Sequence, residues 1–165
     1  MFEFLKKSKE FEIEPEKNCI YAPVKGTVIP LSEVNDDMFS QEMLGKGVAI
    51  KPEDNTFYAP VSGTVTVAAK SSHAIAITTE EGLEVLVHIG IDTVELNGEY
   101  FKKFVNPGEK IRAGQRMVTF DGEKIRQSGY DTVTMIIVTN SSDYNRIEPK
   151  VGISVNEMDK VIEIG

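Results

Sequence analysis

The sequence has few of the residues on which disulfide-rich or metal-dependent proteins rely. Its 165 residues include one cysteine, Cys19, two histidines and no tryptophan. A single cysteine excludes an internal disulfide and suits the reducing conditions of the cytoplasm. No apolar run approaches the roughly 20 residues that a membrane-spanning helix needs, and the N-terminus does not resemble a signal peptide. We therefore expect a cytoplasmic protein.

Positive charge is also scarce. Against 26 Asp and Glu residues there are 18 Lys and Arg, a formal net charge of −8. Nucleic-acid-binding domains carry basic patches, so no nucleic acid is expected as a partner. The acidic balance favours protein partners with positive surfaces. At this length the chain buries about 70% of its unfolded surface, which is enough for one core.

The chain contains an internal duplication. The segments Tyr21–Val28 and Tyr58–Val65 read YAPVKGTV and YAPVSGTV, and the second starts 37 residues after the first. Each copy is followed by an alternating apolar segment, and the first connection is ten residues longer than the second. Short β-patterns separated by Pro and Gly favour antiparallel strands over βαβ units. The predicted fold is an all-β antiparallel sandwich, or barrel-sandwich hybrid, with an internal duplication and only short helical turns.

The two ends of the chain differ in character. Residues 1–17 carry little core pattern and are expected to form a mobile tail before one domain over residues 18–165. Apolar residues and three lysines near the start, Lys6, Lys7 and Lys9, permit at most weak contact with an anionic membrane. Residues 151–164 alternate enough to predict a final strand.

A strand is predicted over Val85–Ile89. Alternation places Val85, Val87 and Ile89 on one face, while Leu86 and His88 point to the other. His88 therefore lies apart from the most apolar face, directly before Gly90.

The second histidine, His73, belongs to the same predicted hairpin. A two-residue turn at Glu81–Gly82 pairs Ile75 with His88 and His73 with Gly90, so that both imidazoles emerge on one face. A three-residue turn shifts the register by one and places them on opposite faces. The expectation that the histidines converge therefore depends on the turn.

Two converging histidines favour nucleophilic chemistry over metal binding. A catalytic zinc usually has three protein ligands, and the chain has no third histidine. A neutral imidazole can attack phosphorus with one nitrogen if an acceptor, here a carbonyl near Gly90, holds the proton on the other. We expect His88 to be the nucleophile and His73 to stabilise the charge of the phosphoryl group. No metal or cofactor is expected.

The additional ten residues of the first connection fall within residues 32–44, where a loop with a short helical turn is predicted. Met38, Phe39, Met43 and Leu44 make this segment more apolar than a solvated loop requires. Two interpretations stay open. These side chains cap one end of the sandwich, or they form an exposed apolar ring around the histidines that docks several partners.

Residues 106–118 are expected to form a turn, a short strand and another turn. Their pattern Gly-x-x-Ile-x-x-Gly-Gln also occurs in lipoyl carrier domains and in lysostaphin-like zinc peptidases. The chain lacks a lipoyl-type lysine at a hairpin tip and the His-x-His pair of such peptidases. We interpret the segment as scaffold.

The histidine hairpin, with Val87-His88-Ile89-Gly90-Ile91-Asp92-Thr93-Val94 as its core, resembles the glucose-class enzyme IIA of the bacterial phosphoenolpyruvate-dependent sugar phosphotransferase system. The resemblance extends over roughly residues 20–155 and includes both Ala-Pro-Val-x-Gly segments. It implies a phosphocarrier that accepts a phosphoryl group on His88 from the phosphocarrier protein HPr. The group then passes to a cysteine on the IIB domain of a glucose-type sugar permease.

The resemblance also implies roles for other residues. His73 matches the second active-site histidine of the family, and Ser71 occupies the place of the threonine that usually hydrogen-bonds it. Ala69 and Leu86 replace phenylalanines of some members. The docking surface implied by the family comprises Asp36 and Asp92, which meet basic residues of HPr, and the apolar residues Met38, Phe39, Met43, Leu44, Leu86 and Val94.

Two further functions remain as alternatives. One is a zinc-dependent hydrolase of the lysostaphin type on a similar architecture. The other is a purely regulatory protein-binding module in which the histidines control docking. Sugar selectivity belongs to a membrane partner outside this chain, and an initiating methionine favours a free-standing subunit.

Overall fold

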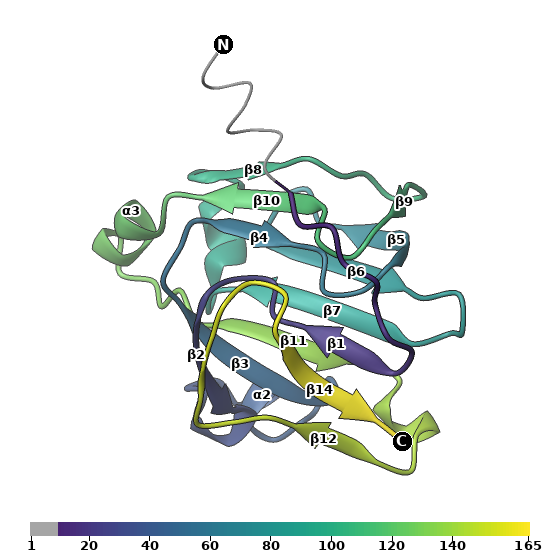
Figure 1. The fold of residues 1–165 in the computed structure, drawn as a ribbon. Helices are drawn as coiled ribbons and strands as arrows, with labels where there is room; N and C mark the ends of the chain where they lie inside the picture. The colour runs from purple at the N-terminus through teal and green to yellow at the C-terminus, as the bar shows by residue number, and fades with distance from the viewer. Residues whose placement is uncertain (1–9) are drawn as a thin grey trace.

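A computed structural model describes residues 10–165, and its architecture is a set of antiparallel sheets with short helical segments (Figure 1). Every pair of neighbouring strands is antiparallel. This confirms the predicted all-β fold with short helical turns.

The largest sheet has eight strands in the order β13-β2-β3-β11-β7-β6-β5-β9. Their bounds are β13 Ser154–Val155, β2 Gly26–Pro30, β3 Lys46–Pro52, β11 Thr134–Val138, β7 Glu84–Ile89, β6 Ala74–Thr78, β5 Gly63–Ala68 and β9 Lys110–Ile111. All five residues of the central strand β11 are buried, because apolar side chains cover both faces of the sheet there.

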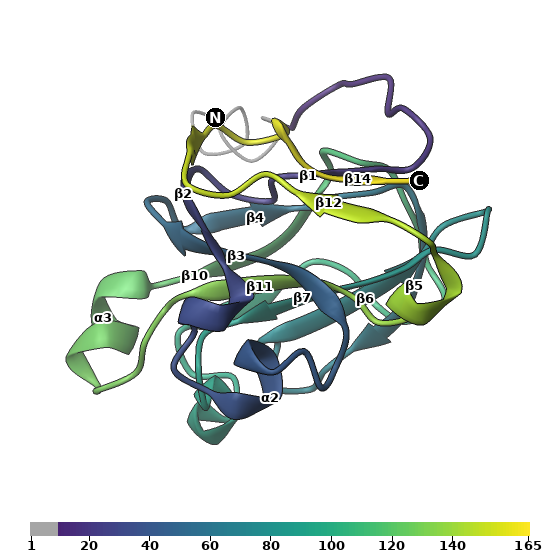
Figure 2. The same ribbon diagram turned by 90° about the horizontal axis from the view of Figure 1, so that it is seen from below.

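Two smaller sheets have three strands each. One has the order β1-β14-β12, with β1 Cys19–Tyr21, β14 Lys160–Ile164 and β12 Ile147–Pro149; the other has the order β4-β10-β8, with β4 Thr56–Tyr58, β10 Arg116–Phe120 and β8 Phe101–Lys103. The helical segments are η1 Leu31–Glu33, α2 Asp37–Ser40, η2 Thr93–Leu96, α3 Gly122–Gln127 and η3 Ser141–Asp143. Figure 2 shows α2 against one face of the large sheet, on the side away from β1, β12 and β14.

The sequence duplication is a structural duplication. Each copy begins with a short strand, β1 or β4, and continues into a hairpin of the large sheet, β2–β3 or β5–β6. The copies bind each other reciprocally, because Tyr21 N donates to Pro60 O at 3.0 Å and Tyr58 N donates to Pro23 O at 2.8 Å. Equivalent residues thus exchange equivalent bonds, as expected of a pseudo-two-fold relation.

The close approach of strands within each repeat requires glycine at one equivalent position in each copy. A Cβ on Gly26 would collide with the carbonyl oxygen of Lys51, and a Cβ on Gly63 with that of Thr78. Both glycines begin the first strand of their hairpin, where the neighbouring strand passes too close for a side chain.

The main core lies on one face of the large sheet and a second cluster on the other. The second cluster consists of Leu31, Val34, Phe39, Ala49, Val133, Met135 and Ile137. The first three come from the long connection between β2 and β3, so the predicted insertion, which contains the predicted helical turn, covers the sheet. This favours the capping interpretation for part of the insertion.

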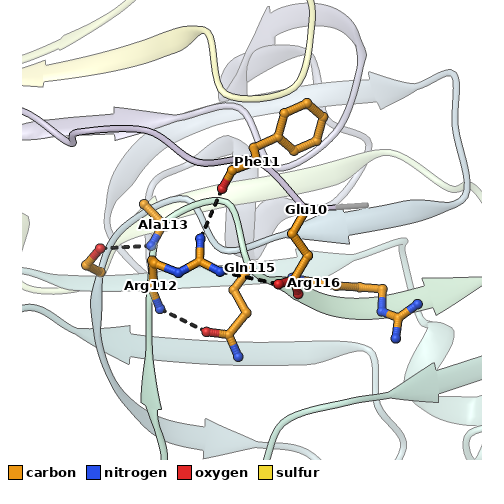
Figure 3. A network of polar contacts seen from close by, with 7 residues as sticks. Glu10, Phe11, Arg112, Ala113, Gln115 and Arg116 are labelled. Carbon is orange, nitrogen blue, oxygen red and sulfur yellow. Dashed lines mark hydrogen bonds and ion pairs between the residues drawn. The ribbon is translucent and has the colours of Figure 1, made fainter. Parts of the chain in front are cut away.

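Residues 10–13 contact the main domain. Phe11 N donates to Gly114 O at 3.1 Å. The Arg112 guanidinium donates to Phe11 O at 3.0 Å, and Glu10 pairs with Arg112 at 3.3 Å (Figure 3). The predicted boundary at residue 18 stays a prediction. The expected membrane contact of the first nine residues lies outside the described part of the chain.

Residues 106–115 form turns on either side of β9, as predicted, but residues 116–118 already belong to β10 and not to the predicted second turn. The C-terminal segment contains the short strand β13 before the predicted final strand, which is β14.

Candidate active site

His88 lies near the end of β7, on the face opposite the main core. Val85, Val87 and Ile89 are buried in that core, as the predicted alternation requires. The ring nitrogen Nδ1 of His88 lies 3.0 Å from the carbonyl oxygen of Gly90. A carbonyl oxygen only accepts, so Nδ1 carries the proton and Nε2 keeps its lone pair. The predicted acceptor near Gly90 is thus present.

The backbone after His88 is tied to neighbouring segments. Gly90 has φ +85°, and its N–H donates to Val133 O at 2.9 Å. The hydroxyl of Thr93 donates to Ile89 O. An added Cβ on Gly90 would collide with Thr93 and lie 2.9 Å from Asp131 O. These contacts fix the position of the carbonyl that orients His88.

The two imidazoles lie together, with ring centroids 4.9 Å apart and an interplanar angle of 84°. The register that was predicted to bring them together is wrong. The structure pairs Ala74 with His88 and Ile75 with Val87, a shift of one residue. The reason is a three-residue turn over residues 80–82, closed by hydrogen bonds between Thr79 and Leu83.

His73 lies just before β6, so the alternation of side chains along that strand does not decide which way it points. It can therefore reach His88. Ser72 has φ +64°, a left-handed conformation that redirects the chain just before His73. The carbonyl of His73 accepts from Ile89 N at 2.7 Å, so the end of β7 holds this turn. The predicted convergence is therefore present, although its route differs from the expected one.

Ser71 makes the contact that the resemblance implied. Its hydroxyl oxygen lies 2.7 Å from Nδ1 of His73, whose side chain is buried with 7% exposure. When the hydroxyl donates, Nδ1 accepts and Nε2 of His73 carries the proton. This arrangement leaves the N–H of His73 available to a ligand between the two rings.

Lys103 supports the same turn. Its ammonium group donates to the carbonyl oxygens of Ala69 at 3.1 Å and Ala68 at 3.4 Å. This contact could not be predicted from the sequence. No pattern near Lys103 signals it, because the partners are backbone groups 34 and 35 residues away.

The site keeps both imidazoles neutral. Burial lowers the pKa of His88 from 6.5 to about 4, and the neighbouring His73 adds to this effect. The Gly90 hydrogen bond and the Asp36 carboxylate act in the opposite direction. Burial also lowers the pKa of His73. At physiological pH both imidazoles are therefore neutral, and Nε2 of His88 keeps its lone pair.

The expected docking residues differ in how exposed they are. Met38, Met43 and Val94 are exposed at 49%, 67% and 51%. Leu44, Leu86 and Asp36 are half-buried, and Asp92 is exposed. Phe39 does not belong to the exposed apolar surface that was expected, since only 4% of it is exposed. The centroid of its phenyl ring lies 5.0 Å from that of the His88 imidazole.

Residues 10–165 contain no group of three or more His, Cys, Asp and Glu side chains that could hold a metal ion. The two histidines supply two nitrogen ligands, against the three protein ligands that a catalytic zinc usually has.

Sequence comparison identifies the family of this site. Residues 18–144 match the sequence model of the phosphoenolpyruvate-dependent sugar phosphotransferase system, EIIA 1. The chain belongs to this family. It contains a glucose-type enzyme IIA domain, as the resemblance predicted, and a role in phosphoryl transfer in general follows.

Relatives of this enzyme IIA domain are both separate and fused proteins. The glucose-specific EIIA component of Oceanobacillus iheyensis is 38% identical over 90% of this chain and 88% of the relative. The beta-glucoside-specific EIIBCA component of Bacillus subtilis is 46% identical over 80% of this chain but 22% of the relative. This chain thus spans about a fifth of the length of the fused relatives.

The fold agrees with a solved structure of the family. Glucose permease IIA from Mycoplasma capricolum superposes with a TM-score of 0.81 at 36% identity, covering 92% of this chain and 98% of that one. These comparisons give no support to a zinc-dependent hydrolase or a purely regulatory module. Among residues 10–165, no helix has the length and apolar character required to cross a bilayer.

Proposed function

We propose that this domain carries a phosphoryl group on Nε2 of His88. The donor is phospho-HPr and the acceptor is a cysteine on the IIB domain of a glucose-class sugar permease, which places the reaction in the cytoplasm. The observation that supports this most directly is the bond from Nδ1 of His88 to Gly90 O, because it leaves Nε2 as the nitrogen with a lone pair.

In the forward step, the lone pair of His88 Nε2 attacks phosphorus. The bond between phosphorus and the donor histidine breaks, and its electron pair returns to the donor ring. The proton on Nδ1 stays hydrogen-bonded to Gly90 O, and the partial negative charge of that carbonyl oxygen stabilises the positive charge that develops on the imidazole. In the onward step, a cysteine thiolate attacks the phosphorus and His88 leaves as neutral imidazole.

His73 stabilises the transferring group. With Nδ1 accepting from Ser71, its Nε2–H donates to a phosphoryl oxygen and offsets charge in the transition state. The exposed apolar side chains of Met38, Met43 and Val94 supply a docking surface for both partners. Asp36 and Asp92 add negative charge at its edge, to pair with basic residues of HPr.

The test is incubation with phosphoenolpyruvate, enzyme I and HPr, followed by intact mass and acid-lability measurements. Wild type is expected to gain one acid-labile phosphate, and His88→Ala none. His73→Gln, the matched control at the second ring, is expected to be labelled but to pass the group slowly to a IIB domain. An unlabelled wild-type chain, or a labelled His88→Ala variant, would refute the proposal.

A further inference from the structure

The imidazole of His88 lies between two other rings. His73 approaches it edge-on at 4.9 Å, and Phe39 lies 5.0 Å away at an interplanar angle of 54°. With Nδ1 fixed on Gly90 O, the ring of His88 is restricted by three groups. The proposed chemistry accounts for two of them, His73 and Gly90, and leaves the role of Phe39 open.

The two flanking rings come from equivalent connections of the duplicated unit. His73 belongs to the short connection between β5 and β6, and Phe39 to the long connection between β2 and β3. Because Ala49 on β3 and His88 on β7 pair with the same residue of β11, Met135, all three lie on one face of the sheet. The long connection folds back over this face, and Phe39 packs in the cluster that contains Met135 and Ala49.

The burial of Phe39 separates it from the docking surface. Its neighbour Met38 is 49% exposed and Met43 is 67% exposed, whereas Phe39 is 4% exposed. A partner therefore meets the methionines first, and contact with Phe39 requires displacement of the connection. The contact that Phe39 does make, within its own chain, is with the proposed nucleophile.

We propose that Phe39 is a positioning residue for His88, and that the ten additional residues of the first repeat serve to place it there. The inference rests on the proposed function of His88. The phenyl ring limits rotation of the imidazole and excludes water from one side of it. Nε2 then remains the nitrogen presented to the phosphoryl donor, and the imidazole remains neutral.

Three variants separate positioning from simple packing. Phe39→Ala removes the ring, and Phe39→Leu keeps apolar volume without an aromatic face. Leu31→Ala removes apolar volume from the same cluster, where Leu31 is 3% exposed on η1. The titratable groups that face His88, namely His73 and Asp36, are unchanged in all three.

The experiment measures each variant in two ways. Nitrogen-15 NMR of the imidazoles gives the tautomer and pKa of His88 without any partner protein. Single-turnover phosphoryl transfer from phospho-HPr, normalised to the folded fraction from urea titration, gives the rate.

For Phe39→Ala we expect the pKa of His88 to rise towards 6.5 and the transfer rate to fall about tenfold or more, as misplacement of a reacting group predicts. For Phe39→Leu, both the pKa of His88 and the transfer rate should lie between those of Phe39→Ala and wild type. Leu31→Ala should keep the wild-type pKa and rate per folded molecule.

If Phe39→Ala matches Leu31→Ala in both measurements, Phe39 is a packing residue and the inference is wrong. If Phe39→Ala does not fold, Phe39→Leu decides between the same outcomes. If wild type accepts no phosphate, the proposed function fails, while the NMR measurement still tests whether Phe39 orients His88.

Discussion

At the residue scale, the orientation of His88 depends on one backbone carbonyl. Gly90 places that carbonyl through a left-handed conformation, φ +85°, which most side chains adopt only with strain. Val133 and Thr93 then hold the turn from two sides. The tautomer of the proposed nucleophile is therefore set by a residue without a side chain.

Gly90→Ala is expected to destabilise the fold by about 2–3 kcal/mol, because strain at positive φ is combined with a collision at Thr93. It should also change the tautomer distribution of His88. Gly108→Ala is the matched control, since Gly108 has φ +92° but nothing within 4 Å of an added Cβ. The control should lose only about 1 kcal/mol. Urea unfolding and imidazole NMR measure both effects, and equal losses in the two variants would contradict the argument.

Much of the site could be predicted at this scale because its bonds are local. Ser71 and His73 are two residues apart, as are His88 and Gly90, so the motif itself carries both contacts. Phe39 and Lys103 could not be predicted in this way. Their contacts cross 49 and 34 residues of chain and depend on how a loop folds over the sheet.

At the element scale, the register between β6 and β7 could not be predicted from the sequence, because it depends on the length of the turn that joins them. The histidine hairpin was predicted correctly, but one additional turn residue shifted the register. Turn length decides which residues face each other, and Glu80-Glu81-Gly82 permits either count. The left-handed Ser72 then restored the convergence that this register would have removed.

The helix α2 provides a prediction at this scale. The side chain of Asp36 accepts from Met38 N at 2.9 Å and caps α2, and Asp121 caps α3 in the same way through Lys124 N at 3.1 Å. Asp36→Ala and Asp121→Ala should each cost about 1 kcal/mol. Only Asp36→Ala should also lower the pKa of His88, because the carboxylate of Asp36 raises it. Urea unfolding and NMR titration of His88 test this; an equal pKa in both variants would exclude a role for α2 in the electrostatics of the site.

At the scale of the whole molecule, the duplication places one side chain from each repeat beside a residue outside both. His73 and Phe39 come from the hairpin connections of the second and first repeats, and His88 comes from β7, which follows them. The site therefore exists only when the hairpins of both repeats are assembled in the large sheet. Stability of the molecule and protonation of the site are consequently linked.

This linkage predicts how stability depends on pH. The pKa of His88 is about 4 in the folded protein, against 6.5 for the unfolded reference, so the unfolded chain binds more protons between these values. The stabilisation is present above pH 6.5 and is lost as the pH falls towards 4. The shift corresponds to at most about 3 kcal/mol, and the lowered pKa of His73 acts in the same direction.

Urea unfolding of wild type and His88→Gln from pH 7.5 to 4 measures this pH-dependent stabilisation. The carboxylates are common to both proteins, so their contribution cancels in the difference. The free energy of unfolding of wild type should fall relative to the variant across this window, and parallel curves would show that burial does not hold His88 neutral.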